Sequence, residues 1–324
     1  MYVLVYKRDR VRNNADLIAY QELMNHSLLR SKNTTLPYHA LHQLYSIYYV
    51  YYFARYDFVN AYSYAQKVVK LIEAHPHQIS EDPPAYINAL HNLLVVLGRL
   101  KKYNELILII QKMRAVNIKY ERFRDSIFYS TNIHQLTMYS DTGQYDKGLK
   151  LITEISGELN VAFLHKAREM EIHYVISLIY FGVGRYRDAR NYLNKIINDS
   201  INDLRSDINC FARIINLIVH YELGNLDLLE YIVKSTYRFL YKRNRLYKVE
   251  TTIVDFIRRK IPSIFTDQER IEAFQELKTE LEEITKDPFE KIAIEYFDFI
   301  SWIKSKIENR PFAQIVQEKA GQKL

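Results

Sequence analysis

The residue types best suited to chemistry, histidine and cysteine, are few in this chain: ten His and one Cys. Two short motifs could bring imidazoles together: His39-x-x-His42, which would place both rings on one helix face, and His75-Pro76-His77. Paired imidazoles are common zinc ligands, but no carboxylate lies near the first pair in the sequence. The second pair falls at an expected helix end, where a histidine cation interacts favourably with the helix dipole. We therefore predict no metal site and no cofactor.

The sequence also lacks the common catalytic signatures. There is no His-Glu-x-x-His, Cys-x-x-Cys or Gly-x-Ser-x-Gly motif, no Gly-rich phosphate loop and no dinucleotide fingerprint. Cys210 lies in an apolar helical run with Phe211 and Ile214, which predicts a buried small hydrophobe rather than a reactive thiol. The carboxylate pairs Glu169/Glu171 and Glu282/Glu283 fit solvated helix positions. We predict that the protein is not an enzyme.

The elements that position these residues are expected to be helices. Only 8 Gly and 7 Pro interrupt 324 residues, of which 48% are hydrophobic, so long helices with short connections are favoured over sheets. The longest apolar run, Ile47 to Ala54, is too short to span a bilayer, and the first charges follow apolar residues, unlike a signal peptide. We expect an all-α protein in the cytoplasm with no membrane association.

The chain contains 28 Tyr, and this abundance has two interpretations. The tyrosines could form an aromatic binding surface. Alternatively, they reflect the base composition of the genome and fill helix interfaces.

Five segments share one pattern, in which a turn precedes a large apolar anchor residue and a small or apolar residue follows three positions later. The anchors are 45, 42, 41 and 40 residues apart: Phe58, Tyr103, Tyr145, Tyr186 and Leu226. The apolar residues on both sides of each turn follow a helical period. Each unit is therefore predicted to be an antiparallel helix pair whose apolar faces are covered by neighbouring pairs.

The motif Gly184-x-Tyr186-x-x-Ala189, with Tyr180 before the Gly and Leu193 after the Ala, resembles the tetratricopeptide-repeat signature. The period of 40–45 residues is longer than the usual ~34. Leucine (Leu94, Leu136, Leu217) also replaces the usual small residue of the first helix in three units. The resemblance implies an α-solenoid, a right-handed superhelix of antiparallel helix pairs, in which the first helix of each pair lines a concave groove.

The pattern predicts four regions. Residues 1–36 form a partial N-terminal repeat that includes a helix over 14–30, and residues 37–244 form five tetratricopeptide-like repeats. Residues 245–309 form a helical cap with helices over 246–259, 267–285 and 288–307, and residues 310–324 form a flexible tail. Helix starts are indicated by Asp82-Pro83, by Asp287-Pro288 and by a capping box from Thr266 to Glu269.

If the first helix of each pair lines the groove here too, its inward positions can be identified from the sequence. These positions are polar and lie at similar offsets from the turn. They are Gln43, Ser46, Asn88, His91, Ser130, His134, Glu171 and Tyr174. These side chains could bind an extended peptide or a partner helix. Alternatively, they are only the solvated side of each amphipathic helix.

Charge is unevenly distributed along a chain with a net charge of +7. Eight basic residues oppose two acidic ones over 238–260, and twelve acidic residues oppose six basic ones over 267–308. The predicted basic patch comprises Arg238, Lys242, Arg243, Arg245 and Lys248. It could bind phosphate or nucleic acid, pair with the acidic helices that follow, or be solvated.

The function expected from these features is that of a non-catalytic scaffold or adaptor that binds a peptide or partner protein in the groove. The alternative is a nucleic-acid-associated regulatory protein that uses the basic block 238–260. Self-association through the edge of the stack near Met1 is a third expectation.

Overall fold

The structure, a computed structural model, describes residues 18, 20–22, 24–26, 29, 36–116, 121–161, 165–198 and 205–321. Every regular element within these residues is a helix, so the all-α prediction is confirmed. The chain divides into two compact units, Met1–Gln135 and Leu136–Leu324. None of the helices in the described part combines the length and apolar character that a bilayer span needs.

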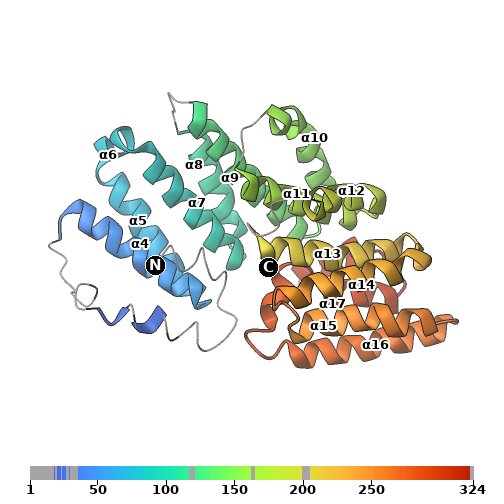
Figure 1. Ribbon diagram of the computed structural model, residues 1–324. Coiled ribbons are helices and arrows are strands. Elements are labelled where there is room, and N and C mark those ends of the chain that lie inside the picture. The colour runs from blue at the N-terminus through green and yellow to red at the C-terminus, as the bar shows by residue number, and fades with distance from the viewer. Residues whose placement is uncertain are drawn as a thin grey trace. The chain divides into compact units, whose positions relative to one another are not determined.

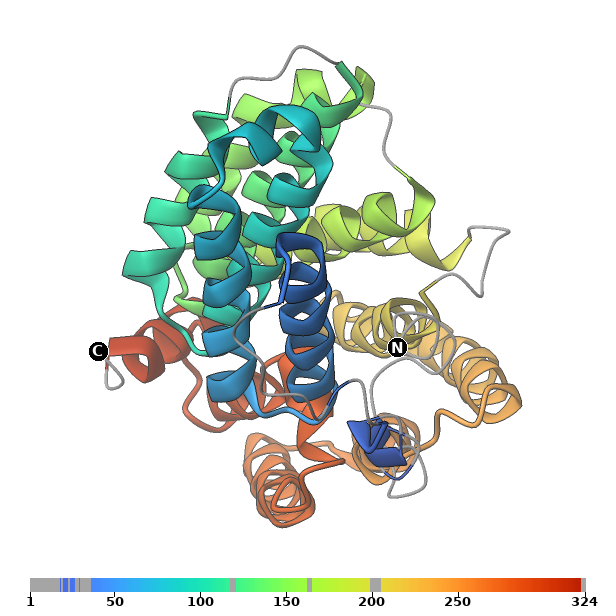
Figure 2. The same cartoon turned by 90° about the vertical axis from the view of Figure 1, so that its left-hand side faces the viewer.

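Unit 1 consists of helices that pack on their neighbours in chain order (Figures 1 and 2). They are α4 (Tyr38–Ala54), α5 (Phe58–Glu73), α6 (Pro76–Glu81), α7 (Pro83–Arg99), α8 (Tyr103–Arg114) and the first part of α9 (Glu121–Asp141). The pairs are α4 with α5 and α7 with α8, and α5 packs against α7 to join them. The N-terminal partial repeat predicted for residues 1–36 lies almost entirely outside the described residues.

Unit 2 contains further helix pairs and a C-terminal helical region (Figure 1). Its helices are α10 (Tyr145–Val161), α11 (Lys166–Gly182), α12 (Tyr186–Ile197), α13 (Ser206–Glu222), α14 (Leu226–Lys242), α15 (Lys248–Asp255), η1 (Phe256–Lys260), η2 (Ile261–Ser263), α16 (Asp267–Ile284), η3 (Lys291–Glu295), α17 (Phe299–Ile307) and α18 (Phe312–Gly321). Here α11 pairs with α12 and α13 with α14, and α12 packs against α13. The segment η1 is a π-helix, and η2 and η3 are 3-10 helices.

The same turn recurs at all five predicted repeat positions. One residue in each has a left-handed backbone: Tyr56 (φ 61°), Lys101 (φ 57°), Gly143 (φ 68°), Gly184 (φ 76°) and Gly224 (φ 70°). The N–H of the following residue donates to the carbonyl five positions back, as from Asp57 to Tyr52 (3.0 Å) and from Arg185 to Tyr180 (2.9 Å). The next helix then begins two residues after the left-handed one, at the predicted anchor. The repeat period is therefore the distance along the chain between successive turns of the same geometry.

Two further turns of this kind lie beyond the predicted repeats. Asn244 (φ 53°) and Asn309 (φ 50°) are left-handed, and the residues after them donate to Leu240 (3.0 Å) and Ser305 (3.1 Å). Asparagine tolerates this conformation better than most residues. The sequence pattern fails here because the next helices begin later, at Lys248 and Phe312.

The helix after each of the five turns buries the same three positions. They lie 3, 7 and 10 residues after the anchor, on one helical face, and in α12 they are Ala189, Leu193 and Ile196, all with no exposed surface. In α10 the first of these positions is Gly148, where a Cβ would lie 2.6 Å from Ile179 Cδ1. Glycine there allows α10 to approach α11 closely.

The helix-start signals are confirmed at two of three places. Asp82 accepts a hydrogen bond from the Ala85 N–H (3.2 Å), and Thr266 and Glu269 form both bonds of a capping box. Asp287 instead accepts from the Phe289 N–H (2.8 Å) in a turn. The helix predicted over 288–307 is therefore replaced by η3 and α17, and Asp298 caps α17.

The flexible tail predicted for 310–324 is wrong over most of its length. Residues 312–321 form α18, and the Phe312 ring stacks on Phe297 (5.8 Å between centroids) and meets the Phe181 ring edge-on (5.3 Å). The Gln317 amide donates to the Gly143 carbonyl (2.8 Å). The sequence pattern could not indicate the contacts with Phe181 and Gly143, because these residues lie more than 100 positions earlier in the chain.

Alanine at the glycine turns should separate backbone strain from packing. Gly184→Ala should cost about 1–2 kcal/mol, because only the left-handed conformation is penalised and no atom lies within 4 Å of the added Cβ. Gly143→Ala should cost more, since its Cβ would lie 2.7 Å from Gln317 Cγ and 3.0 Å from the Gln317 backbone nitrogen. Urea unfolding of both variants measures the difference, and equal losses would contradict the packing of α18 on this turn.

Phe312→Ala should lower the free energy of unfolding by about 3 kcal/mol, because a buried aromatic ring is replaced by a cavity. The matched control is Phe265→Ala, whose ring is 85% exposed and whose loss should cost at most about 0.5 kcal/mol. Denaturant midpoints of the two variants provide the measurement. A loss at Phe312 no larger than at Phe265 would refute the docked position of α18.

Candidate partner-binding surface

The six predicted groove residues of unit 1 divide by exposure. Gln43 on α4 and Asn88 on α7 are exposed. Ser46 is buried and its hydroxyl donates to the His42 carbonyl (2.7 Å) within the same helix, while Ser130 is 2% exposed. The amides of Gln43 and Asn88 are therefore available to a ligand, and the two serine hydroxyls are not.

The other two predicted residues of unit 1, His91 and His134, lie against each other between α7 and α9. Their ring centroids are 5.2 Å apart, and the Tyr129 ring lies 6.1 Å from His91. Burial lowers the pKa of His134 well below its usual value, and the neighbouring His91 and Arg99 charges lower it further. The folded state therefore favours the neutral form of the His134 imidazole, which packs against His91 between the two helices.

The two histidine motifs meet around Tyr38, a contact that sequence reasoning did not find. The Tyr38 ring lies 5.1 Å from His39, 6.2 Å from His42 and 5.0 Å from His75. They meet because α4 and α5 are antiparallel, so the beginning of one helix lies beside the end of the other. His75 Nδ1 lies 2.9 Å from the Leu71 carbonyl, consistent with its predicted place at a helix end. Among the described residues, no group of three or more His, Cys, Asp or Glu is arranged to hold a metal ion.

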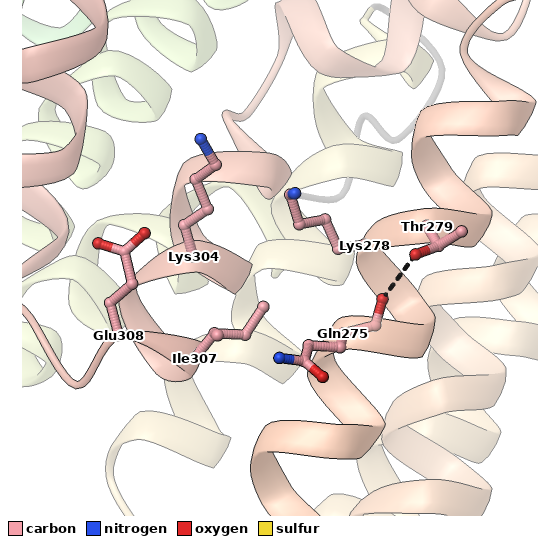
Figure 3. A pocket seen from close by; sticks show the side chains of 6 residues that line it. All are labelled: Gln275, Lys278, Thr279, Lys304, Ile307 and Glu308. Atoms are coloured by element: carbon pink, nitrogen blue, oxygen red, sulfur yellow. Dashed lines mark hydrogen bonds between the residues drawn. The ribbon is translucent and has the colours of Figure 1, made fainter.

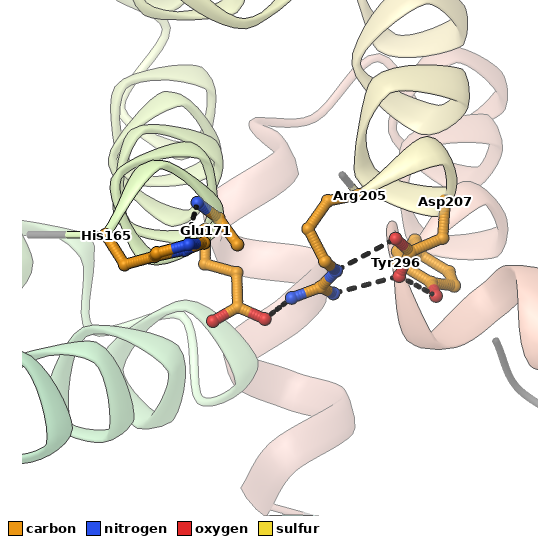
Figure 4. A network of polar contacts seen from close by, with 6 residues as sticks. His165, Glu171, Arg205, Asp207 and Tyr296 are labelled. Atoms are coloured by element: carbon orange, nitrogen blue, oxygen red, sulfur yellow. Dashed lines mark hydrogen bonds and ion pairs between the residues drawn. The ribbon is translucent and has the colours of Figure 1, made fainter. Parts of the chain in front are cut away.

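In unit 2 the predicted residues Glu171 and Tyr174 bind other parts of the chain, and Figure 4 shows the network around Glu171. The Arg205 guanidinium lies between Glu171 and Asp207, with which it makes an ion pair on each side. The Tyr296 hydroxyl donates to Asp207 Oδ2 (2.8 Å). The Tyr174 hydroxyl donates to the Tyr296 carbonyl oxygen (3.0 Å), and Tyr174 is buried.

The C-terminal segment covers the first helices of unit 2 beyond this network. Tyr296 stacks on Phe211 of α13, with centroids 4.1 Å apart and the planes 8° from parallel. The Trp302 indole N–H donates to Glu222 Oε1 (2.7 Å), and the Lys306 ammonium binds Glu222 Oε2 (2.6 Å). The surface where Glu171 and Tyr174 were expected to meet a ligand is thus used internally, whereas Gln43 and Asn88 of unit 1 remain open.

The five residues of the predicted basic patch also differ in exposure and in internal contacts. Arg238, Lys242 and Lys248 are exposed. The Arg243 guanidinium lies 3.9 Å from the centroid of the Phe239 ring, and Arg245 donates to the Ser206 hydroxyl (3.1 Å). The predicted patch is therefore a smaller exposed surface on α14 and the start of α15.

Pairing between the basic block and the acidic helices is local. Lys260 forms an ion pair with Glu276 of α16 (3.0 Å). Arg259 pairs with Asp255 of its own segment (3.5 Å). The acidic helix thus neutralises one end of the block and leaves Arg238 and Lys242 in no ion pair within the described part of the chain.

A pocket of about 340 Å³ lies between α16 and α17 in unit 2 (Figure 3). It is lined by Gln275, Lys278, Thr279, Lys304, Ile307 and Glu308. The Lys278 ammonium pairs with Glu282 (3.4 Å). Lysine side chains from both helices line the pocket together with the Glu308 carboxylate.

Cys210 is buried as predicted, and burial raises the pKa of its thiol to about 12. The protonated thiol is a poor nucleophile. Its role in the described structure is packing within α13.

Comparisons with known proteins do not assign the chain to a family. No protein-family model matches it, and a search of curated proteins also finds no match. Function is therefore inferred from the arrangement of its own residues.

Acid should destabilise the protein through its buried histidines. Burial, assisted by the Lys195 charge, lowers the pKa of His173 to about 4, so the folded state favours the neutral imidazole. The stabilisation is complete above the unfolded value near 6.5 and is lost as the pH falls toward 4. Between pH 8 and 5, His173 alone should cost about 2 kcal/mol of unfolding free energy.

Urea unfolding at pH 8, 6.5 and 5 measures this dependence, and His173→Gln should flatten it by that amount. The pH 8 value of the variant corrects for any packing loss. A variant with the same pH dependence as the unsubstituted chain would show that His173 is not held neutral.

Proposed function

We propose that the protein is a non-catalytic scaffold or adaptor that binds a peptide or partner helix on the first helices of unit 1. The observation that carries the proposal is the contrast between the two sets of groove positions. Gln43 and Asn88 are exposed on α4 and α7, whereas Glu171 and Tyr174 are bound to other residues of unit 2.

The tetratricopeptide-like solenoid belongs to this proposal. Its support is the turn that recurs at intervals of 40–45 residues, together with the pairing of successive helices. In such arrays the neighbouring pairs supply each other's apolar contacts. A regular row of first helices then presents side chains at similar heights to a ligand that runs across them.

The two exposed amides suit recognition of a peptide main chain. Each carries a carbonyl acceptor and an NH₂ donor, so each can satisfy both the C=O and the N–H of a peptide group. Such contacts position a ligand without demanding a particular side chain. The partner's identity would then depend on the apolar and aromatic residues around them.

Affinity capture with the full chain tests the proposal. The double variant Gln43→Ala with Asn88→Ala should reduce recovery of the partner at least about tenfold, if each lost hydrogen bond contributes about 1 kcal/mol or more. The matched control is Asn104→Ala with Gln111→Ala, the same residue types at exposed positions of α8. Quantitative mass spectrometry measures recovery, and circular dichroism verifies that both variants remain helical.

Equal recovery with both double variants would refute binding at Gln43 and Asn88. Loss with the control alone would place the binding surface on the second helices.

A further inference from the structure

Helix α14 exposes aromatic side chains in a way that sets it apart from the other described helices. Tyr231 is 76% exposed, Tyr241 66% and Tyr237 38%. Many other tyrosines, such as Tyr49, Tyr86 and Tyr174, are buried between helices. The interpretation that tyrosines fill helix interfaces therefore holds for those residues, and α14 presents the other case, an aromatic surface.

A row of cations lies along the same exposed face. Lys234, Arg238 and Lys242 follow one another at four-residue spacing, so they project from neighbouring turns. The opposite face carries the buried residues Leu229, Val233, Thr236 and Leu240. Lys234 pairs with Glu230 (2.6 Å), while Arg238 and Lys242 form no ion pair within the described residues.

Tyr237 and Tyr241 lie on one flank of this row. Their rings are within 10° of parallel, with centroids 6.4 Å apart. Glu230 lies on the same flank, two turns before Tyr237, and its pKa is lowered by Lys234 and, to a smaller extent, by Arg258 of η1. Since η1 packs against α14, its exposed Arg258 adds a further cation near the Glu230 end of this surface. The two rings thus lie beside the row formed by Lys234, Arg238 and Lys242.

We propose that this surface, formed by α14 and η1, binds single-stranded nucleic acid without sequence preference. Exposed aromatic rings provide a stacking platform for unpaired bases, and flanking lysine and arginine side chains contact the phosphates. A row of cations alone would fit an acidic peptide equally well. Parallel exposed rings beside a row of cations favour a ligand whose flat π-faces alternate with anionic groups, which is the chemistry of a single strand.

Duplex nucleic acid fits this surface less well. Its bases are already stacked and paired, so Tyr237 and Tyr241 would contact only the backbone. The surface lies in unit 2, on the second helix of its pair, and so goes beyond the partner binding proposed for the first helices of unit 1.

Fluorescence anisotropy of the full chain with a labelled oligothymidine of about 20 nucleotides tests the proposal, because this length exceeds the ~4–16 nucleotides that a single-strand-binding fold commonly covers. We expect the logarithm of the association constant to fall linearly with the logarithm of the salt concentration. Tyr237→Ala with Tyr241→Ala should weaken binding about tenfold or more through lost stacking and leave the salt dependence unchanged. The corresponding double Trp variant should restore binding.

Arg238→Ala with Lys242→Ala should reduce the salt slope by about 1.4, since each phosphate contact to a single strand contributes about 0.7. The matched control, Lys150→Ala with Arg187→Ala, removes the same charge from exposed positions of α10 and α12 and should leave the slope unchanged. All substituted residues are exposed or nearly so, and circular dichroism verifies that the variants remain helical.

Three results would overturn the proposal. The first is no binding to oligothymidine at low salt. The second is equal weakening by the control pair, which would indicate only the net charge of the chain. The third is binding of polyglutamate or of a duplex as tight as that of oligothymidine and insensitive to the tyrosine variants, which would assign the surface to another anionic partner.

Discussion

The described fold depends on one backbone constraint, the left-handed residue that ends a helix and starts the next. At each such turn, the N–H after the left-handed residue donates to a carbonyl five residues earlier, which satisfies one of the helix's otherwise unpaired C-terminal acceptors. The turn holds the next helix two residues away at the five regular positions. Once the helices are held this close, their apolar faces can be covered only by each other, and the buried positions 3, 7 and 10 residues after each anchor follow.

This constraint explains which features could be predicted from the sequence. Gly143, Gly184 and Gly224 signal the left-handed conformation directly, whereas Tyr56 and Lys101 adopt it without such a signal and were found only through the period. The turns at Asn244 and Asn309 were not predicted, because the following helices begin three or four residues later and break the spacing. Local rules thus identify the paired helices, and they fail where the connection changes length.

The candidate surfaces depend on contacts that no local pattern encodes. Tyr174 has the spacing of a groove residue, yet its hydroxyl binds the carbonyl of Tyr296, 122 residues later. The Glu222 side chain is nearly buried, and its carboxylate accepts from the Trp302 indole and the Lys306 ammonium. Arg238 and Lys242 were predicted as part of a basic patch, but only the packed positions of α14 and η1 show which tyrosines share their exposed face. Sequence periodicity assigns residues to a helical face; the distant partners decide whether that face meets solvent.

The docking of α18 has a consequence for synthesis of the chain. Gln317 binds the carbonyl of Gly143, a separation of 174 residues. At typical elongation rates of about 5–20 residues per second, roughly 9 to 35 s pass between the synthesis of these two residues. During that interval the ring faces of Tyr145 and Phe181 that Phe312 later covers are open on the nascent chain. Unit 2 is therefore completed late, and this aromatic surface needs protection from premature association while translation continues.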